Sequence, residues 1–429
     1  MKVLWIVNSL LPDIARVCGL KSDNDGGWLT GMLHGLNSFC NEPEIIICFP
    51  FSGKRLQGQV NNLKFISFAE KSNYKENKKT KQEIADILEN EDPEIIHIFG
   101  TEFPHALAAV KWAEENGKLD RVLINIQGLI SKCSECYYAG LPFSVVHRFT
   151  LRDFIKRGNI YRQRKKFAKR GKLEIAVLKT AKHVSGRTDW DKVCVLDIND
   201  KIHYHKCNET LRDVFYSGQW EKNNIEPYSV FVTQCGYPLK AFHMVLKAFR
   251  ELVKKYPDAH LYTTGKDLTS LNVIKNTKHR TYYDVYLKKL IYKYNLKEHV
   301  TFLGSLNGEE IKERLLKSHV FVLPSSLENS SNSLGEALLL GVPCVASDVG
   351  GVRTFIKHGE NGLIYSFDET QTLANYIDEI FSDDSLAENL SVNARQSVKT
   401  IFDAGINAKT LFAIYREIAG SSGENDNEK

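Results

Sequence analysis

The densest group of chemically useful residues lies in the segment ENSSNSLGEALLLGVPCVASDVGGV, residues 328–352. Two carboxylates in it, Glu328 and Glu336, stand eight positions apart. An apolar run ends just before Glu328, and the pattern from Ser333 to Gly341 is typical of a helix closed by glycine. We therefore expect Glu328 in a strand-to-helix loop and Glu336 in the first turn of the helix.

The start of this predicted helix is suited to an anion, because its first backbone N–H groups have no intrahelical acceptor. An acid on each side could accept hydrogen bonds from hydroxyls flanking a diphosphate. That layout fits a nucleotide sugar, with Glu328 at the sugar and Glu336 at the ribose. A structural interpretation stays open, since Ser333 and Glu336 also have capping-box spacing.

A second candidate site is FVTQCGYPLKAFHMVLKAF, residues 231–249, whose pattern predicts strand, loop and helix. Pro238 suits a first helical turn. Lys240 then falls in that turn, where the helix dipole disfavours a cation unless an anion binds beside it. The alternative is an ordinary solvated surface lysine.

The elements that must position these residues form two series of short β-branched runs alternating with helical patterns. Such alternation predicts doubly wound parallel sheets, and 429 residues suit two α/β domains. The predicted strands are 2–7, 44–49, 94–99, 121–126, 183–186, 229–234, 260–265, 299–304, 319–324, 343–347 and 362–366. The predicted helices are 26–38, 80–90, 104–116, 238–255, 284–295 and 308–317.

We expect an N-terminal domain over 1–220 and a C-terminal domain over 226–405. The polar, aperiodic segment 218–229 is the predicted linker. A helix is expected over 406–420, followed by a disordered tail, 421–429.

Composition favours a cytoplasmic protein. Hydrophobic residues make up 43% and charged residues 25%, and no apolar run reaches the ~20 residues of a membrane-spanning helix. The N-terminal apolar stretch lacks a preceding basic region, so we interpret it as a strand rather than a signal peptide. Nine cysteines, an odd number, indicate reduced thiols.

Charge is concentrated in residues 148–172, which hold eleven Lys and Arg against the single acid Asp153. Aromatic and aliphatic residues are interspersed with them, which is typical of a helix on an anionic membrane surface or of a site for an acidic acceptor. A solvated helix face is the alternative. Nucleic acid is not expected, because no nucleic-acid-binding motif accompanies the charge.

Residues 328–351 and the segment PLKAFHMVLKAF resemble glycosyltransferase family 4, retaining enzymes of the GT-B fold. That fold has two Rossmann-like domains facing across a cleft. The resemblance implies that Glu328 contacts the donor sugar, that Glu336 binds the ribose and that Lys240 pairs with the diphosphate. It also implies that backbone amides face the diphosphate, and these are the amides of Ser331, Asn332, Ser333 and Leu334.

Two positions depart from the family pattern. The family usually has arginine five positions before the lysine, where this chain has Cys235. Arg187 and Arg353 are candidate replacements. A glycine often follows the lysine, where this chain has Ala241.

Glycines mark three further predicted donor contacts. Gly26 and Gly27 open a helical pattern, and the resemblance implies that their loop faces the diphosphate. Gly265 and Gly304 end two predicted strands, where the resemblance places the nucleobase. Ordinary turns are the alternative for all four.

The segment 94–112 predicts a strand, a loop and a helix. His97 lies inside the strand and is expected in the core. The resemblance implies a histidine beside the transferred sugar in this region, and we assign acceptor- or sugar-facing roles to Glu102 and His105. A helix-capping histidine is the alternative for His105.

Later loops of this half carry further candidates, with Gln127, Gly128, Arg187 and Asp191 expected near the donor. The pattern GRTDWD, 186–191, resembles a bacterial surface-polysaccharide subgroup.

Metal binding is not expected. Cys133-x-x-Cys136 lacks a second pair at zinc spacing. His203, His205 and Cys207 alternate on one predicted strand face but do not complete a ligand set. Neutralisation by Lys240 and helix dipoles would then replace a metal, with no cofactor besides the nucleotide sugar.

The sequence thus predicts a retaining glycosyltransferase of the hexosyl-transferring type. Its donor is a nucleotide-diphosphate sugar, and its acceptor is a glycan or lipid-linked molecule of surface polysaccharide synthesis. We expect it in the cytoplasm, peripheral to the inner face of the membrane through 148–172. A nucleotide-sugar epimerase and a non-catalytic sugar-nucleotide-binding relative remain alternatives. A nicotinamide enzyme is disfavoured, because no GxGxxG precedes a downstream acid.

Overall fold

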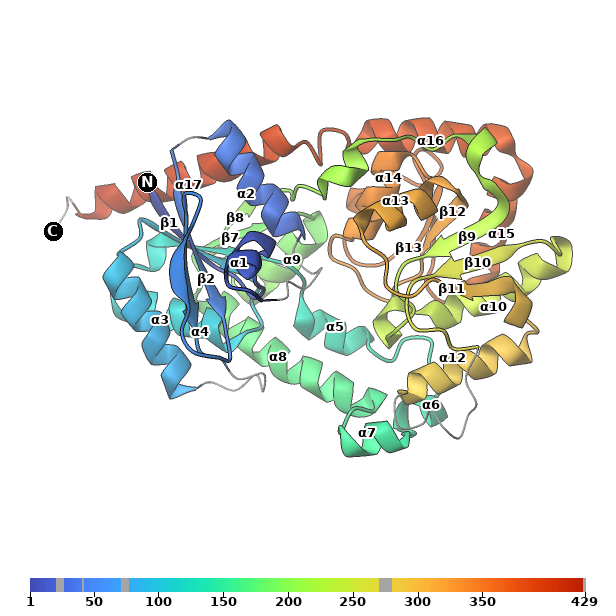
Figure 1. Ribbon diagram of the computed structural model, residues 1–429, viewed down its shortest axis with the longest axis horizontal. Coiled ribbons are helices and arrows are strands. Elements are labelled where there is room, and N and C mark those ends of the chain that lie inside the picture. Colours follow the sequence, from blue (N-terminus) through green and yellow to red (C-terminus); the bar gives the residue numbers. More distant parts are fainter. Residues whose placement is uncertain (21–26, 41, 71–76, 270–279, 427–429) are drawn as a thin grey trace. The chain divides into compact units, whose positions relative to one another are not determined.

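The computed structural model describes residues 1–20, 27–40, 42–70, 77–269 and 280–426. Contacts divide the chain into two compact units. Unit 1 comprises residues 1–131, 169–211 and 401–429, and unit 2 comprises 132–168 and 212–400. Each unit is an α/β structure built on one sheet, which confirms the predicted fold class (Figure 1).

Unit 1 is built on an eight-stranded sheet of order β3-β4-β2-β1-β5-β6-β7-β8. Every neighbouring pair is parallel except the hairpin β3–β4. The strands are β1 Lys2–Ile6, β2 Glu44–Pro50, β3 Gln57–Val60, β4 Leu63–Phe68, β5 Ile95–Phe99, β6 Val122–Asn125, β7 His183–Gly186 and β8 His203–Lys206. The helices are α1 Pro12–Val17, α2 Gly27–Phe39, α3 Lys78–Glu91, α4 Pro104–Glu115, α9 Asp189–Ile198 and α17 Ala404–Asp426.

Helices cover both faces of this sheet, because the strands are apolar on both sides. In β1, Leu4 and Ile6 pack against α3 and α4, whereas Val3 and Trp5 pack in the opposite cluster, with α2 and α17. The Trp5 indole donates to the Tyr415 hydroxyl of α17 at 2.9 Å. A helix from the far end of the chain therefore completes the core around the first strand.

His97 is a core residue, as predicted. It is fully buried in β5, and its Nδ1 lies 2.6 Å from the Tyr415 hydroxyl. Burial lowers the pKa of His97 to about 3, so the imidazole is neutral.

Unit 2 is built on a six-stranded, all-parallel sheet of order β11-β10-β9-β12-β13-β14. Its strands are β9 Glu226–Val232, β10 His260–Thr263, β11 Val300–Phe302, β12 Ser318–Leu323, β13 Cys344–Ser347 and β14 Leu363–Tyr365. Its helices are α6 Phe143–His147, α7 Leu151–Ile155, α10 Phe242–Lys255, α12 Tyr282–Lys293, α13 Gly308–Leu316, α14 Asn332–Leu340, α15 Thr370–Ser382 and α16 Asp384–Val398. Two helices run from one unit into the other, α5 Ile130–Cys136 and α8 Ile160–Thr180.

The two units differ from the predicted domain limits in two segments. Residues 132–168 belong to unit 2, although we expected them in the N-terminal domain, and residues from 401 onward return to unit 1. β9 begins at Glu226, inside the predicted linker. Trp220 of that linker is buried, and its indole donates to the Ser318 carbonyl at 2.8 Å.

The C-terminal helix is longer than predicted. α17 runs to Asp426, beyond the expected end at 420 and into the segment expected to be disordered. Residues 427–429 lie outside the described residues.

Across the described residues, none of the helices combines the length and apolar character required to cross a bilayer.

Candidate active site

Lys240 and Glu328 meet at the point where the strand order of the unit 2 sheet reverses. β9 has β10 on one side and β12 on the other, so the loops after β9 and β12 diverge there. The first loop carries Lys240 and the second carries Glu328. The Lys240 ammonium lies 2.5 Å from Glu328 Oε1. The Ser325 hydroxyl donates to the same oxygen at 2.6 Å.

The backbone around Lys240 differs from the predicted helical turn. Pro238–Lys240 form a single 3-10 turn, and α10 begins only at Phe242. Ala241 joins them at φ 45°, in the left-handed region that glycine favours. This explains why related chains place glycine here, since a side chain costs roughly 1–2 kcal/mol in that conformation.

Lys240 keeps its positive charge in this setting. Burial by itself would lower the pKa of the ammonium, but the Glu328 carboxylate and Tyr237 outweigh it and hold the pKa above its ordinary value. Lys240 is therefore a charged ammonium that pairs with Glu328 and can bind an incoming anion.

The loop that carries Glu328 is fixed by two glycines of the same motif. The Gly351 N–H donates to the Glu328 carbonyl at 3.0 Å. Gly350 has φ +53°, and a Cβ on it would lie 1.9 Å from the Glu328 carbonyl oxygen. Ser347 adds a hydrogen bond from its hydroxyl to the Ser325 carbonyl at 2.6 Å. The double glycine thus allows the close approach that sets the position of Glu328.

Helix α14 follows this loop and begins at Asn332, with Ser331 as its N-cap. The Ser331 hydroxyl accepts from the Leu334 N–H at 3.4 Å and lies 3.0 Å from the Ser333 hydroxyl. Gly341 closes the helix at φ 78°, as the sequence predicted. The first turn therefore presents serine hydroxyls and amides together, as a diphosphate site requires.

Glu336 is the fifth residue of α14, so it lies beyond the first turn in which we expected it. The alternative capping box with Ser333 does not form either, because Ser331 is the N-cap. Its partner is Arg212, whose Nε and Nη2 donate to Oε1 at 2.9 and 2.7 Å. The same guanidinium lies 4.7 Å from the Phe215 ring centroid. No sequence signal connected Arg212 with Glu336, because the two are 124 residues apart.

Glu336 is almost fully buried, and burial raises its pKa to about 7 although Arg212 acts in the opposite direction. We expect a specific pH dependence of stability from this. Between about 4.5, the ordinary value, and about 7, the folded protein holds a proton that the unfolded chain has lost. The contribution of Glu336 to the free energy of unfolding is therefore complete below this pH window, and it falls by about 3 kcal/mol as the pH rises through the window.

Glu336→Gln should remove this dependence. The difference in free energy of unfolding between wild type and variant, measured in denaturant at pH 5 and pH 8, should change by about 3 kcal/mol in favour of the variant. A difference that stays constant across this range would contradict the prediction.

Cys235 occupies the position where the family usually has arginine, and it is a neutral thiol. It is buried, and burial raises its pKa to about 11. Its Sγ lies 3.2 Å from the Thr264 carbonyl oxygen. A Cβ on Gly265 would lie 2.9 Å from this sulfur, and Gly265 pairs through its N–H with the Gly304 carbonyl at 2.8 Å. Cys235 therefore packs beneath the two turns where the nucleobase was predicted.

The two candidate replacements for the missing arginine are both paired with acids. Arg353 binds Asp348 through two hydrogen bonds of 2.8 and 2.6 Å. Arg187 of unit 1 is buried against Glu209, and its Nη2 donates to the Gln127 carbonyl at 3.0 Å.

The remaining loop candidates near Arg187 support unit 1 internally. Asp191 caps α9 and accepts from the Arg187 N–H at 3.0 Å. The Gln127 side chain donates to Glu209 at 3.0 Å.

His105 and Glu102 are both buried in unit 1, and their predicted contact with sugar or acceptor stays a prediction. The His105 Nδ1 binds Glu70, and its ring stacks on Phe103 with centroids 5.1 Å apart. Glu102 pairs with Arg170 at 2.7 Å. These contacts hold the loop after β5.

The glycine-rich loop is described only in part. Gly26 lies outside the described residues, and Gly27 is the first residue of α2. Cys133 and Cys136 are not joined in a disulfide. Cys207 packs into the core cluster around β1.

Comparisons with known proteins bear on the family and the fold. Residues 215–397 match the family model described as glycosyl transferases group 1. A putative glycosyltransferase, YtcC of Bacillus subtilis, is 27% identical over 183 residues, which are 42% of this chain and 43% of that protein. The aligned part therefore spans less than half the length of that curated relative.

Two solved structures share the fold over almost the whole chain. Sucrose-phosphate synthase from Thermosynechococcus elongatus has a TM-score of 0.69 at 14% identity and covers 98% of this chain and 99% of its own. Anabaena Alr3699/HepE in complex with UDP has a TM-score of 0.66 at 14% identity and covers 97% and 100%. The chain therefore has the GT-B fold and carries a glycosyltransferase group 1 domain in residues 215–397.

Proposed function

We propose that this chain is a retaining glycosyltransferase that moves a sugar from a nucleotide-diphosphate sugar to a glycan or lipid-linked acceptor. One observation carries the proposal: Lys240, Glu328 and the start of α14 converge at the switch point of one sheet. The UDP bound by the structural neighbour HepE supports a nucleotide diphosphate as the leaving group. The pattern at 186–191 supports an acceptor from surface polysaccharide synthesis.

The Lys240–Glu328 pair accounts for the first step. When a donor binds, the ammonium exchanges the Glu328 carboxylate for the diphosphate, and Glu328 becomes free to accept from sugar hydroxyls. The buried Arg212–Glu336 pair presents a second acceptor to the ribose. Both acids are thus positioned by cations of the same unit.

Bond breaking places negative charge on the diphosphate. Lys240 and the amides at the start of α14 stabilise that charge, and stabilisation of this kind lowers the barrier more than any other effect in many enzymes. The acceptor hydroxyl attacks the anomeric carbon from the leaving-group face, and its proton passes to the departing phosphate. The configuration is retained, and the step uses no metal.

Binding and turnover of a panel of nucleotide sugars test the proposal. We expect one donor to bind, and an acceptor to be required for its transfer. Conversion of the donor to an epimer without acceptor would support the epimerase. Binding without release of nucleotide diphosphate would support a non-catalytic relative, for which the neutral Cys235 is the favouring observation.

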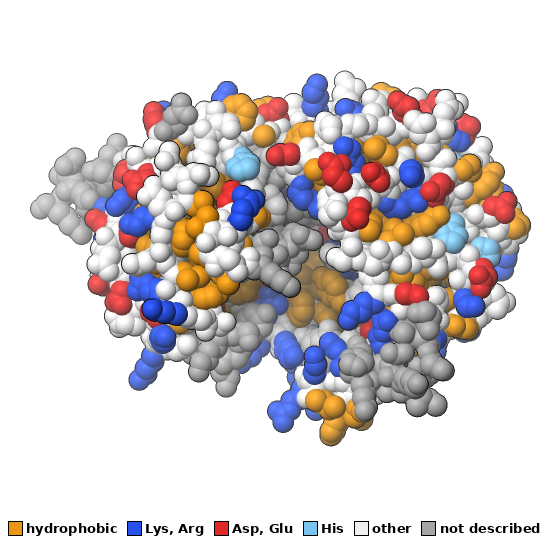
Figure 2. All heavy atoms as spheres, in the orientation of Figure 1, with side chains coloured by type: hydrophobic (Ala, Val, Ile, Leu, Met, Phe, Trp, Pro, Cys, Tyr) orange, Lys and Arg blue, Asp and Glu red, His pale blue; other side chains and the backbone are white. Residues whose placement is uncertain are grey.

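We also propose peripheral contact with an anionic membrane through the basic segment. Its part in unit 2 carries an exposed apolar patch (Figure 2), bordered by cations. The patch consists of Phe149, Leu151, Phe154 and Ile155, which are between 44% and 68% exposed. Phe154 and Ile155 also line an open cavity of about 470 Å³ together with Arg157 and Arg162.

Hydrogen bonds hold the segment that carries the patch against the rest of unit 2. The Thr150 hydroxyl donates to the Arg280 carbonyl at 2.6 Å, and Asp153 accepts from the Tyr282 N–H at 2.7 Å. Because Asp153 is buried, the single acid of 148–172 does not face solvent. Exposed aromatics ringed by arginine and lysine favour a lipid surface over a merely solvated helix.

Replacing Phe154 and Ile155 together by serine should weaken binding to phosphatidylglycerol vesicles at least about tenfold, because two inserted apolar side chains are lost. Cosedimentation measures this, and added salt should weaken the wild type as well. Val392→Ser, on the equally exposed Val392 of α16, is the matched control. Equal binding of both variants and wild type would contradict membrane contact.

A further inference from the structure

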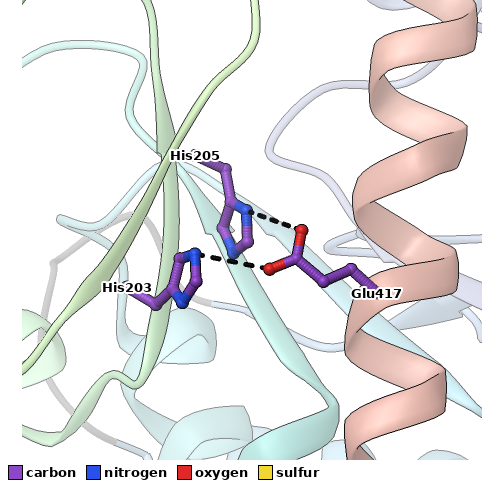
Figure 3. Close-up of side chains that lie close together, drawn as sticks. All are labelled: His203, His205 and Glu417. Atoms are coloured by element: carbon purple, nitrogen blue, oxygen red, sulfur yellow. Dashed lines mark ion pairs between the residues drawn. The ribbon is translucent and has the colours of Figure 1, made fainter.

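Three side chains of unit 1 form a histidine–glutamate cluster apart from the proposed active site: His203 and His205 of β8 and Glu417 of α17. Figure 3 shows both imidazoles directed at the Glu417 carboxylate. Residues 203 and 205 share a strand face because side chains alternate with period two. Their donor atoms and those of Glu417 all lie within 4.8 Å of one another.

The distances in the cluster suit ligands around a cation better than hydrogen bonds. His203 Nε2 lies 3.3 Å from Glu417 Oε1, and His205 Nδ1 lies 3.9 Å from Oε2. The second separation is too long for a hydrogen bond. Nitrogen and oxygen ligands bound at about 2.0–2.1 Å to a tetrahedral ion stand about 3.3 Å apart. A small contraction of the cluster would therefore complete a coordination shell.

A third imidazole orients the buried member of the cluster. His183 on the neighbouring strand β7 has its Nδ1 3.1 Å from His205 Nε2. If His205 Nε2 carries the proton and donates to His183, then Nδ1 presents its lone pair toward Glu417. Metal-bound histidines usually have such a partner on the second ring nitrogen.

The place of the cluster separates it from catalysis. His183 and His203 are the first residues of β7 and β8, whereas the loops with Gln127 and Arg187 follow the opposite ends of β6 and β7. β8 is the edge strand of its sheet, and α17 comes from the end of the chain. His203 and Glu417 are half exposed, so an ion can enter from solvent.

We propose that His203, His205 and Glu417 bind one divalent transition-metal ion, with zinc as the best match, and that His183 positions His205. Two imidazoles, one carboxylate and a water complete a tetrahedral zinc shell. The bound ion would cross-link α17 to β8, the edge strand of the unit 1 sheet. This role is independent of the proposed glycosyl transfer, which uses no metal.

Zinc titration of the metal-stripped full-length chain tests the site. We expect binding of one zinc ion by calorimetry and a higher Tm with zinc than with EDTA. Glu417→Gln and His203→Ala should each weaken binding at least about tenfold and abolish the zinc-dependent rise in Tm. Glu417→Gln keeps the side-chain shape at an exposed position, so this variant is expected to fold. His34→Ala, which removes an exposed imidazole from α2 of the same unit, should leave binding unchanged.

Two readouts distinguish this site from the cysteines. Cobalt bound at the cluster should give visible d–d bands without a thiolate charge-transfer band, since its ligands are nitrogen and oxygen. His183→Ala should keep one metal per chain and lower its affinity about tenfold, as expected for a positioning residue. A thiolate band, or equal zinc affinity in wild type and Glu417→Gln, would overturn the proposal.

Discussion

Lys240→Ala and Glu328→Ala should each lower kcat/KM for sugar transfer at least about 100-fold. Lys240 is the cation that we propose to face the leaving diphosphate, and removal of one charge-stabilising group typically costs that much. The measurement uses the donor selected by the nucleotide-sugar panel. The two variants are not equivalent. Glu328→Ala removes the carboxylate and also leaves the Lys240 ammonium without its partner at 2.5 Å.

Lys254→Ala is the matched control for the lysine. Lys254 belongs to α10, which follows Lys240 directly, but its side chain is 69% exposed and pairs only across the surface with Glu251. This variant should keep wild-type turnover. Turnover close to normal in both site variants would reject the assignment of the site.

Gly350→Ala should be comparably damaging although residue 350 contacts no substrate in the proposed mechanism. A Cβ there would lie 1.9 Å from the Glu328 carbonyl oxygen, so the Glu328 loop must move. A displacement of about 1 Å can cost 100-fold in rate. We therefore expect transfer to fall about 100-fold and the free energy of unfolding to fall beyond the roughly 1–2 kcal/mol of the positive φ alone.

Gly359→Ala separates these two costs. Gly359 also has a positive φ, 79°, but a Cβ there meets nothing within 4 Å. Gly359→Ala should lower the free energy of unfolding only by the cost of the positive φ, and it should keep wild-type sugar transfer. Equal activity of the Gly350 and Gly359 variants would show that the close approach to Glu328 is unimportant.

The fold was predictable from sequence for most strands that are buried on both faces. All eleven predicted strands correspond to strands of the parallel core, because continuous apolar runs such as 44–49 and 319–324 leave little alternative. Three strands were missing from that prediction. β3 and β8 are short, mostly polar edge strands, whereas β4 is buried but short and was overlooked. The assignment of 132–168 to unit 2 depends on tertiary contacts that periodicity does not encode.

Candidate site residues could be predicted where a single short segment carries both the motif and the local structure. The pairing of Lys240 with Glu328 follows from strand order, and the resemblance brought both residues forward. Arg212 could not be found this way, because it acts through a buried acid 124 residues away. The surroundings of His105 could not be predicted either, because Phe68, Phe103 and Glu70 come from separate segments that only tertiary packing brings together.

The return of α17 to unit 1 sets the order in which the two units can be completed during synthesis. All residues of unit 2 precede residue 401, whereas unit 1 at that point still lacks Leu411, Tyr415 and Ile418 against one face of β1. Domains usually fold in order of synthesis. Here we expect unit 1 to be completed after unit 2, with Trp5 lacking its Tyr415 partner until α17 has been made.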